Sequence, residues 1–253
     1  MFQEHPCFST PAGETDIWRF MDLTKFLSML VRNSLFFCRA DGLEDPYEGE
    51  TPKASRAAFQ AQIEAMLPPE PAASLMKMQG DLALLHKTTT FMNCWHMNPT
   101  ESAAMWKLYA SNNEGIAIKT TVRRLRDSLN KWPRPVYIGA VSYNEQAFSH
   151  GNALAPFVFK RRSFQHEQEL RAVVWLLSMF ADMPAVEGEH LQQRAQRLRP
   201  LFDGHVSVDL DLLIENLFVA PMSPLWYGEL VQSLVDKYGL TKKVERSQLY
   251  TLH

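Results

Sequence analysis

The segment FKRRSFQHEQELRAVVWLL, residues 159–177, sets the first constraint on the fold. Its second half, from Glu169 to Leu177, is rich in branched and aromatic residues and predicts a β-strand. Side chains alternate between the two faces of a strand, so Glu169, Arg171 and Val173 are expected on one face. Charged residues at the start of such a strand are poor material for a core, which makes this end of the strand a candidate site.

Strand-like and helix-like segments alternate irregularly around this strand. Asp16 to Phe20 and Thr88 to Trp95 are predicted strands, and Leu225 to Tyr238 is a predicted helix. No unit of strand, tight glycine turn and helix repeats along the chain. The pattern therefore predicts an α+β fold with a mixed or largely antiparallel central sheet flanked by helices.

The chain length of 253 residues favours one domain, 1–253. Within it, Lys53 to Leu67 and Ala72 to His86 are amphipathic and rich in alanine and methionine, which favour helix. Prolines 68, 69 and 71 separate them. We therefore expect a helical hairpin, 53–86, inserted into the single domain.

Composition excludes several classes of protein. Hydrophobic residues make up 46% and the net charge is -2, so the chain is expected to fold and to carry no bulk positive charge for nucleic acid or anionic membrane. Three scattered cysteines fit a reducing compartment. No secretion signal and no run of 18 apolar residues is visible, so we expect a cytoplasmic protein with no membrane partner.

The acidic turn DGLEDPYEGE, residues 41–50, follows a predicted strand, Leu35 to Ala40. Loops at strand ends often carry functional groups on a rigid support, which makes Asp45, Tyr47 and Glu48 candidates. The alternative is an ordinary solvated turn, for which Asp45 before Pro46 is well suited. The two interpretations have equal weight.

The segment MWKLYA, residues 105–110, is predicted to be helical. Met105, Leu108 and Tyr109 lie at helical spacing and suit a core. Trp106 faces another way, and its amphipathic ring could form the floor of a pocket for a planar ligand.

The Glu-x-Glu pair of Glu167 and Glu169 is the third candidate. In extended geometry both project to the face of Arg171. Two neighbouring carboxylates raise one another's pKa and can act as a base or stabilise a developing cation. The alternative is a surface ladder in which Arg171 neutralises Glu169.

The order of these motifs resembles a widespread bacterial family that is classified only as a domain of unknown function. The matching motifs are Asp45-Pro46-Tyr47-Glu48, then M-W-K-L-Y-A, then V-S-Y, and then K-x₃-F-x₂-E-x-E-x-R beginning at Lys160. The resemblance covers most of the chain outside the 53–86 hairpin and residues 185–200. It implies no activity.

A fainter resemblance links the chain to ADP-ribosyltransferases, which use an arginine on an opening strand, an aromatic residue on a middle strand and a late Glu-x-Glu. It implies that Arg19 binds the pyrophosphate of NAD through its guanidinium fork and that an aromatic ring stacks on nicotinamide. It also implies that Glu169, aided by Glu167, stabilises the ribosyl cation as nicotinamide leaves. The candidate NAD-binding residues are Arg19, Trp95, Trp106, Tyr109, Lys160 and Arg171.

Three functions therefore stay open. The first is an ADP-ribosyltransferase-like enzyme, a toxin or phage-defence effector that acts on NAD and a protein or nucleic-acid target. The second is a metal-dependent nuclease-like hydrolase in which Asp45, Glu48, Glu167 and Glu169 hold Mg²⁺ and Lys160 holds a phosphate. The third is a non-catalytic module whose loops bind a ligand or partner.

Overall fold

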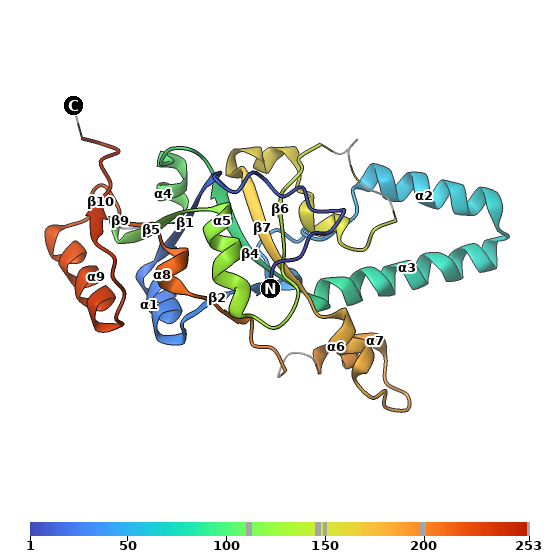
Figure 1. Cartoon of the computed structure of the whole chain (residues 1–253). Coiled ribbons are helices and arrows are strands. Elements are labelled where there is room, and N and C mark those ends of the chain that lie inside the picture. The colour runs from blue at the N-terminus through green and yellow to red at the C-terminus, as the bar shows by residue number, and fades with distance from the viewer. Residues whose placement is uncertain (110–112, 145–147, 149–150, 198–200, 252–253) are drawn as a thin grey trace.

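A mixed sheet of eight strands forms the centre of the computed structural model, which describes residues 1–109, 113–144, 148, 151–197 and 201–251 (Figure 1). Seven strands follow the order β10-β9-β5-β1-β4-β7-β6, and β3 pairs with β4 outside this path. Their bounds are β1 Asp16–Asp22, β3 Cys38–Arg39, β4 Thr90–Met97, β5 Gly115–Thr121, β6 Tyr137–Ala140, β7 Glu169–Trp175, β9 Asn216–Val219 and β10 Val244–Arg246. All pairs are antiparallel except β9 with β10. The α+β prediction is confirmed.

The strand predicted from Glu169 lies inside this sheet as β7, between β4 and β6. A second, two-stranded sheet pairs β2 (Ser34–Phe36) with β8 (His205–Ser207). Both sheets belong to one domain, since a single large cluster of buried side chains joins them.

One face of the sheet is covered by helices. The contributing helices are α1 (Leu23–Arg32), α5 (Val122–Ser128), α8 (Leu210–Leu213) and α9 (Leu225–Lys237). Alternate residues of the strands, such as Ile17, Met21 and Leu170, point to this side and are at most 3% exposed. Asp22 fixes the start of α1, because its carboxylate accepts a hydrogen bond from the Lys25 backbone N–H at 2.7 Å.

The opposite face has a thinner cover. Trp18 and Phe20 of β1 pack there against α4 (Ala103–Tyr109), and Met92 and Val173 pack against the segment that contains the 3₁₀ helix η5 (Ala155–Val158). Because Cys94 pairs with Arg171 and His96 pairs with Glu169 across β4 and β7, these four residues lie on this face. The thinly covered face therefore holds the charged start of β7.

The predicted hairpin consists of α2 (Lys53–Met66) and α3 (Pro69–Thr89), which extend away from the sheet (Figure 1). Its base packs on α6 (Leu177–Asp182) and α7 (Leu191–Gln196), where Leu85, Phe180 and Ala195 are buried together. No helix in the described parts of the chain combines the length and the apolar character needed to cross a bilayer.

Candidate functional site

Arg171 is the centre of a buried ion network on the thinly covered face. Its side chain is 0% exposed and lies against both oxygens of Glu169, with Nε and Nη2 each 2.9 Å from a carboxylate oxygen. Nη2 also donates to Glu48 Oε1 at 2.9 Å, and Nη1 donates to the Phe157 carbonyl at 2.9 Å. A guanidinium is suited to this position because its planar fork can serve two carboxylates at once.

Lys160 adds a second cation to the network. Its Nζ lies 2.7 Å from Glu167 Oε2, 3.3 Å from Glu169 Oε2 and 3.2 Å from Glu48 Oε1. The Phe164 ring, at 4.7 Å, covers the ammonium group. Burial alone would lower the pKa of Lys160, but the neighbouring carboxylates raise it above its ordinary value. Three carboxylates thus surround two cations.

Glu167 does not have the extended geometry that the period-two pattern predicted. It ends the 3₁₀ helix η6 (Arg162–Glu167), and Gln168 then takes the left-handed conformation, with φ of 40°. The turn separates Glu167 from the strand, so alternation does not apply to it. The carboxylates of Glu167 and Glu169 still belong to one network, because both accept a hydrogen bond from the Lys160 ammonium group. The side chain of Glu167 is 16% exposed and that of Glu169 is 6% exposed, so Glu167 is the more accessible.

The acidic turn reaches this network through one residue. Glu48 is 4% exposed, and its second oxygen, Oε2, is buried without a hydrogen-bond partner among the described residues. Asp45 instead accepts two hydrogen bonds of 2.9 Å from Arg161, near the surface. Arg161 also lies 4.6 Å from the ring of Tyr47, which is 61% exposed. Residues more than 100 positions apart in sequence are thus joined.

Three further residues support the network, and none was a candidate from the sequence. The Glu169 backbone N–H donates to the Tyr143 hydroxyl oxygen at 2.9 Å. His96 Nδ1 lies 2.6 Å from the Glu167 carbonyl oxygen, and Cys94, which pairs with Arg171 across β4 and β7, interacts electrostatically with Glu169. The V-S-Y motif was the available signal for Tyr143. His96 and Cys94 become visible only when the pairing of β4 with β7 is known.

The network holds Glu169 in its ionised form. Burial alone would raise the pKa of Glu169, but Arg171 and then Lys160 lower it to about 2. The alternative in which Arg171 neutralises Glu169 therefore describes the contact correctly, although the pair is buried and not at the surface.

This depressed pKa predicts acid sensitivity. The pKa of the Glu169 carboxyl group is about 2 in the folded state, and its ordinary value is 4.5. Such a group stabilises the fold at pH values above its ordinary pKa. The stabilisation, on the order of 3 kcal/mol, should be lost as the pH falls through this range. Urea unfolding of the wild type and of Glu169→Gln across this range measures it. The slope of stability against pH should be smaller in the variant, and equal slopes would contradict the assignment.

Arg19 of β1 is a cation of a different kind. Its side chain is half-buried, and Nη1 donates a hydrogen bond to the Cys94 carbonyl oxygen at 3.2 Å. No carboxylate in the described residues forms an ion pair with it. Burial lowers the pKa of Arg19, and the nearby Cys94 and Tyr109 act in the opposite direction. The guanidinium therefore has unused donors on a partly desolvated surface.

Tyr109 interacts electrostatically with both Arg19 and the ion network, although Arg19 alternates with Ile17 and Met21 along β1 and lies beside the Trp95 ring on the helix-covered side. It is 44% exposed at the end of α4, and burial of its hydroxyl raises its pKa to about 12, with Glu167, Cys94 and Glu169 adding to the shift. The same hydroxyl acts on Arg19. Of the three aromatic candidates, Tyr109 is thus the accessible one.

The two tryptophans lie inside the protein. Trp95 is 2% exposed in the main core, its ring centroid 5.8 Å from Arg19, and its indole N–H donates to Asn93 at 2.7 Å. Trp106 is 3% exposed, packs against Phe20 and donates to Glu101 at 2.9 Å. Both indole N–H groups already have a hydrogen-bond acceptor, and both rings pack in hydrophobic clusters.

The acidic residues fit a metal ion poorly. Glu48, Glu167 and Glu169 already face Lys160 or Arg171, so a divalent cation would have to displace an ammonium or a guanidinium group. Within the described ranges, no group of three or more His, Cys, Asp or Glu side chains is arranged to hold a metal ion.

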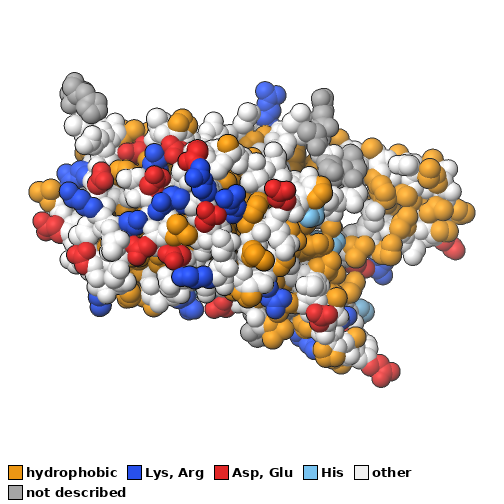
Figure 2. Space-filling model, in the orientation of Figure 1, with side chains coloured by type: hydrophobic (Ala, Val, Ile, Leu, Met, Phe, Trp, Pro, Cys, Tyr) orange, Lys and Arg blue, Asp and Glu red, His pale blue; other side chains and the backbone are white. Residues whose placement is uncertain are grey.

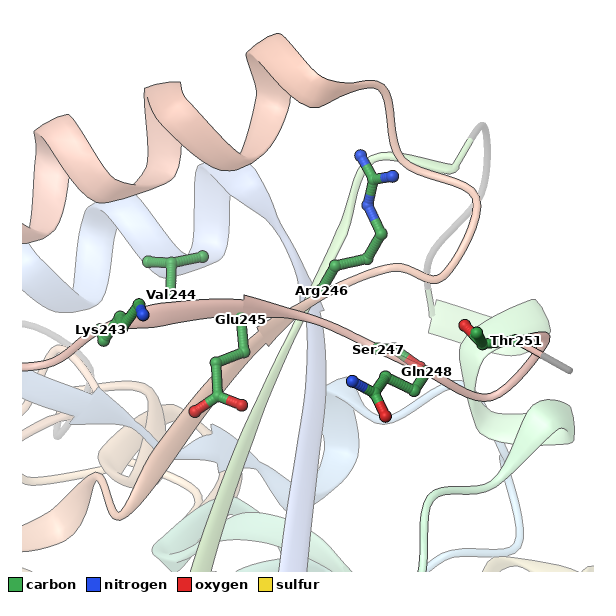
Figure 3. Close-up of a pocket in the computed structure, with 7 residues that line it drawn as sticks. All are labelled: Lys243, Val244, Glu245, Arg246, Ser247, Gln248 and Thr251. Atoms are coloured by element: carbon green, nitrogen blue, oxygen red, sulfur yellow. The ribbon is translucent and has the colours of Figure 1, made fainter. Parts of the chain in front are cut away.

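A separate hollow lies beside β10, at the open edge of the sheet (Figure 3). Its volume is about 410 Å³, and residues 243–248 and Thr251 line it. None of these residues belongs to the ion network, so the hollow is not part of the candidate site.

In comparisons with known proteins, no family model matches this chain, and no curated protein matches its sequence. The two resemblances drawn from the motifs therefore remain predictions.

Proposed function

We propose that this protein is an ADP-ribosyltransferase-like enzyme that binds NAD as a substrate. One observation carries the proposal: the half-buried Arg19 has no carboxylate partner in the described residues, and Tyr109, whose pKa is raised in part by Glu167 and Glu169, also acts electrostatically on it. An unpaired guanidinium on a partly desolvated surface favours an anionic ligand such as a pyrophosphate.

In this proposal the residues have different roles. Arg19 would bind the pyrophosphate, and Tyr109 would offer its exposed ring to nicotinamide. Glu167 is the carboxylate that a ligand can reach, whereas both oxygens of Glu169 are engaged by Arg171. In this proposal Glu167 is the catalytic residue. Glu169, with Arg171 and Lys160, is a positioning residue.

The proposed chemistry needs one negative charge near the ribose. As the bond between ribose and nicotinamide breaks, its electron pair leaves with nicotinamide and positive charge develops on the ribosyl carbon. A carboxylate beside that carbon stabilises the charge. A nucleophile on a protein or nucleic-acid target would then bond to the ribosyl carbon and lose its proton to solvent. We propose that this occurs in the bacterial cytoplasm, as in a toxin or phage-defence effector.

The test is a calorimetric titration with NAD combined with an assay for released nicotinamide. We expect saturable binding below about 1 mM NAD and slow release by the wild type. Glu167→Gln should bind NAD as the wild type does and release nicotinamide at least about 100-fold more slowly. The absence of both heat and nicotinamide at millimolar NAD would reject the proposal.

The two alternatives have less support. The metal-dependent hydrolase would need carboxylates that are now paired with Lys160 and Arg171. A non-catalytic module that binds an anionic ligand could also use Arg19, so the release of nicotinamide is the result that separates the enzyme from it.

A further inference from the structure

The hairpin of α2 and α3 leaves most of its surface uncovered. Ser55 is the one buried residue among the 14 of α2, all of which are described. In α3, the buried residues other than Ala72 all lie in the last five positions. Figure 2 shows a predominantly hydrophobic surface where the hairpin extends from the body. Helices of this length gain most of their stability from packing, so a large uncovered apolar surface needs an explanation.

A regular apolar stripe runs along α3. Leu75, Met78, Leu82 and Leu85 are spaced alternately three and four residues apart, which is the spacing of a helix–helix seam. At the inner end, Leu85 is 6% exposed and packs with Phe180. Further out, Leu82 is 40% exposed and Met78 is 51% exposed. Leu75, at the outer end, is half-buried, so Leu82 and Met78 form the exposed part of the stripe.

The charges of the hairpin are compatible with a second copy as the partner. Residues 53–86 carry three basic and three acidic side chains, so the hairpin has no net charge. This balance gives no attraction for a polyanion and no repulsion between two hairpins. The partner should therefore be an apolar helical surface that is itself neutral. A second hairpin has these properties.

We propose that the stripe of Leu75, Met78 and Leu82 binds the same stripe of a second copy, so that two hairpins form a four-helix bundle and the protein is a homodimer. An interface between identical surfaces has a two-fold axis. An axis between Met78 and Gln79 with antiparallel helices places Leu75 opposite Leu82 of the second copy.

The polar residues beside the stripe are compatible with this symmetry. In the antiparallel arrangement, Gln79 lies beside Gln79 of the second copy, and two amide groups can hydrogen-bond to each other. Asp81 lies near Ser74 of the second copy rather than near its own counterpart. The seam therefore brings no like charges together.

The test is the mass of the full-length protein in solution, measured by light scattering during size-exclusion chromatography over a range of concentrations. We expect the mass of two chains for the wild type. The double variant Met78→Glu with Leu82→Glu should have the mass of one chain, or a dissociation constant raised at least about tenfold. Both side chains are exposed, so circular dichroism should show an unchanged fold.

A matched control is Leu225→Glu with Leu230→Glu, which changes two leucines of α9 that are 75% and 40% exposed. It should remain dimeric. The proposal also predicts that Met78→Cys forms a disulfide between two chains on mild oxidation. A wild type with the mass of one chain at every concentration would overturn the proposal, as would a dimer unaffected by the Glu variants. Binding of a monomeric wild type to neutral phosphatidylcholine vesicles would assign the stripe to lipid and overturn it as well. None of these measurements involves NAD.

Discussion

Replacing Arg171 by methionine should lower the free energy of unfolding by about 3–5 kcal/mol, the largest stability effect that we expect from a single substitution. Methionine fills part of the volume but supplies no charge. Glu48 and Glu169, which are 4% and 5% exposed, would then share Lys160 as their remaining cationic partner. A buried carboxylate that loses its partner must either stay charged in a poor solvent or take up a proton.

The matched control for this prediction is Arg161→Met. Arg161 also pairs with the acidic turn, through Asp45 at 2.9 Å, but the side chain of Arg161 is 46% exposed, whereas that of Asp45 is 9% exposed. Exposed ion pairs contribute about 1 kcal/mol or less. Urea unfolding of both variants at neutral pH measures the difference. Equal losses for Arg171→Met and Arg161→Met would show that the buried network does not hold the acidic turn to the sheet.

The sequence predicted the class of fold because its signals were local. Alternation in Glu169–Trp175 and helical spacing in the Lys53 to His86 segments are properties of neighbouring residues, and the structure has a strand and two helices there. The motifs also identified both Glu48 and Glu169 as candidate site residues. That they share Arg171, 123 positions from Glu48, could not be read from the order alone.

The remaining features depend on contacts between distant segments. Trp95 lies in the main core because it pairs with Leu170 on the helix-covered face, and the pattern of β4 does not reveal which face the helices cover. Glu167 leaves the strand because Gln168 is left-handed, which is a conformation that glutamine rarely takes and that no local signal announced. Arg171 is buried although arginine is usually exposed, because it pairs with Glu169 of its own strand and with Glu48 of a distant segment.

Replacing Arg19 by glutamine should weaken the binding of NAD by about 10- to 100-fold, which corresponds to the loss of a charge-assisted hydrogen bond of about 1.5–3 kcal/mol. The same change should not destabilise the fold. Arg19 donates to the Cys94 carbonyl and forms no ion pair with a described residue, so its half-buried charge has little structural compensation. We therefore expect an unfolding midpoint equal to or higher than that of the wild type. A residue with a purely structural role would give the opposite result.

The most direct test of a shared anion site at Arg19 is a calorimetric titration of NAD into the wild type, Arg19→Gln and Arg161→Gln. Arg161 is the control, because it lies near the same ion network but is already paired with Asp45. The proposal predicts that the dissociation constant for NAD rises in Arg19→Gln alone. A thermal unfolding scan should show that this variant is still folded. Equal affinities in all three proteins would contradict the proposed role of Arg19.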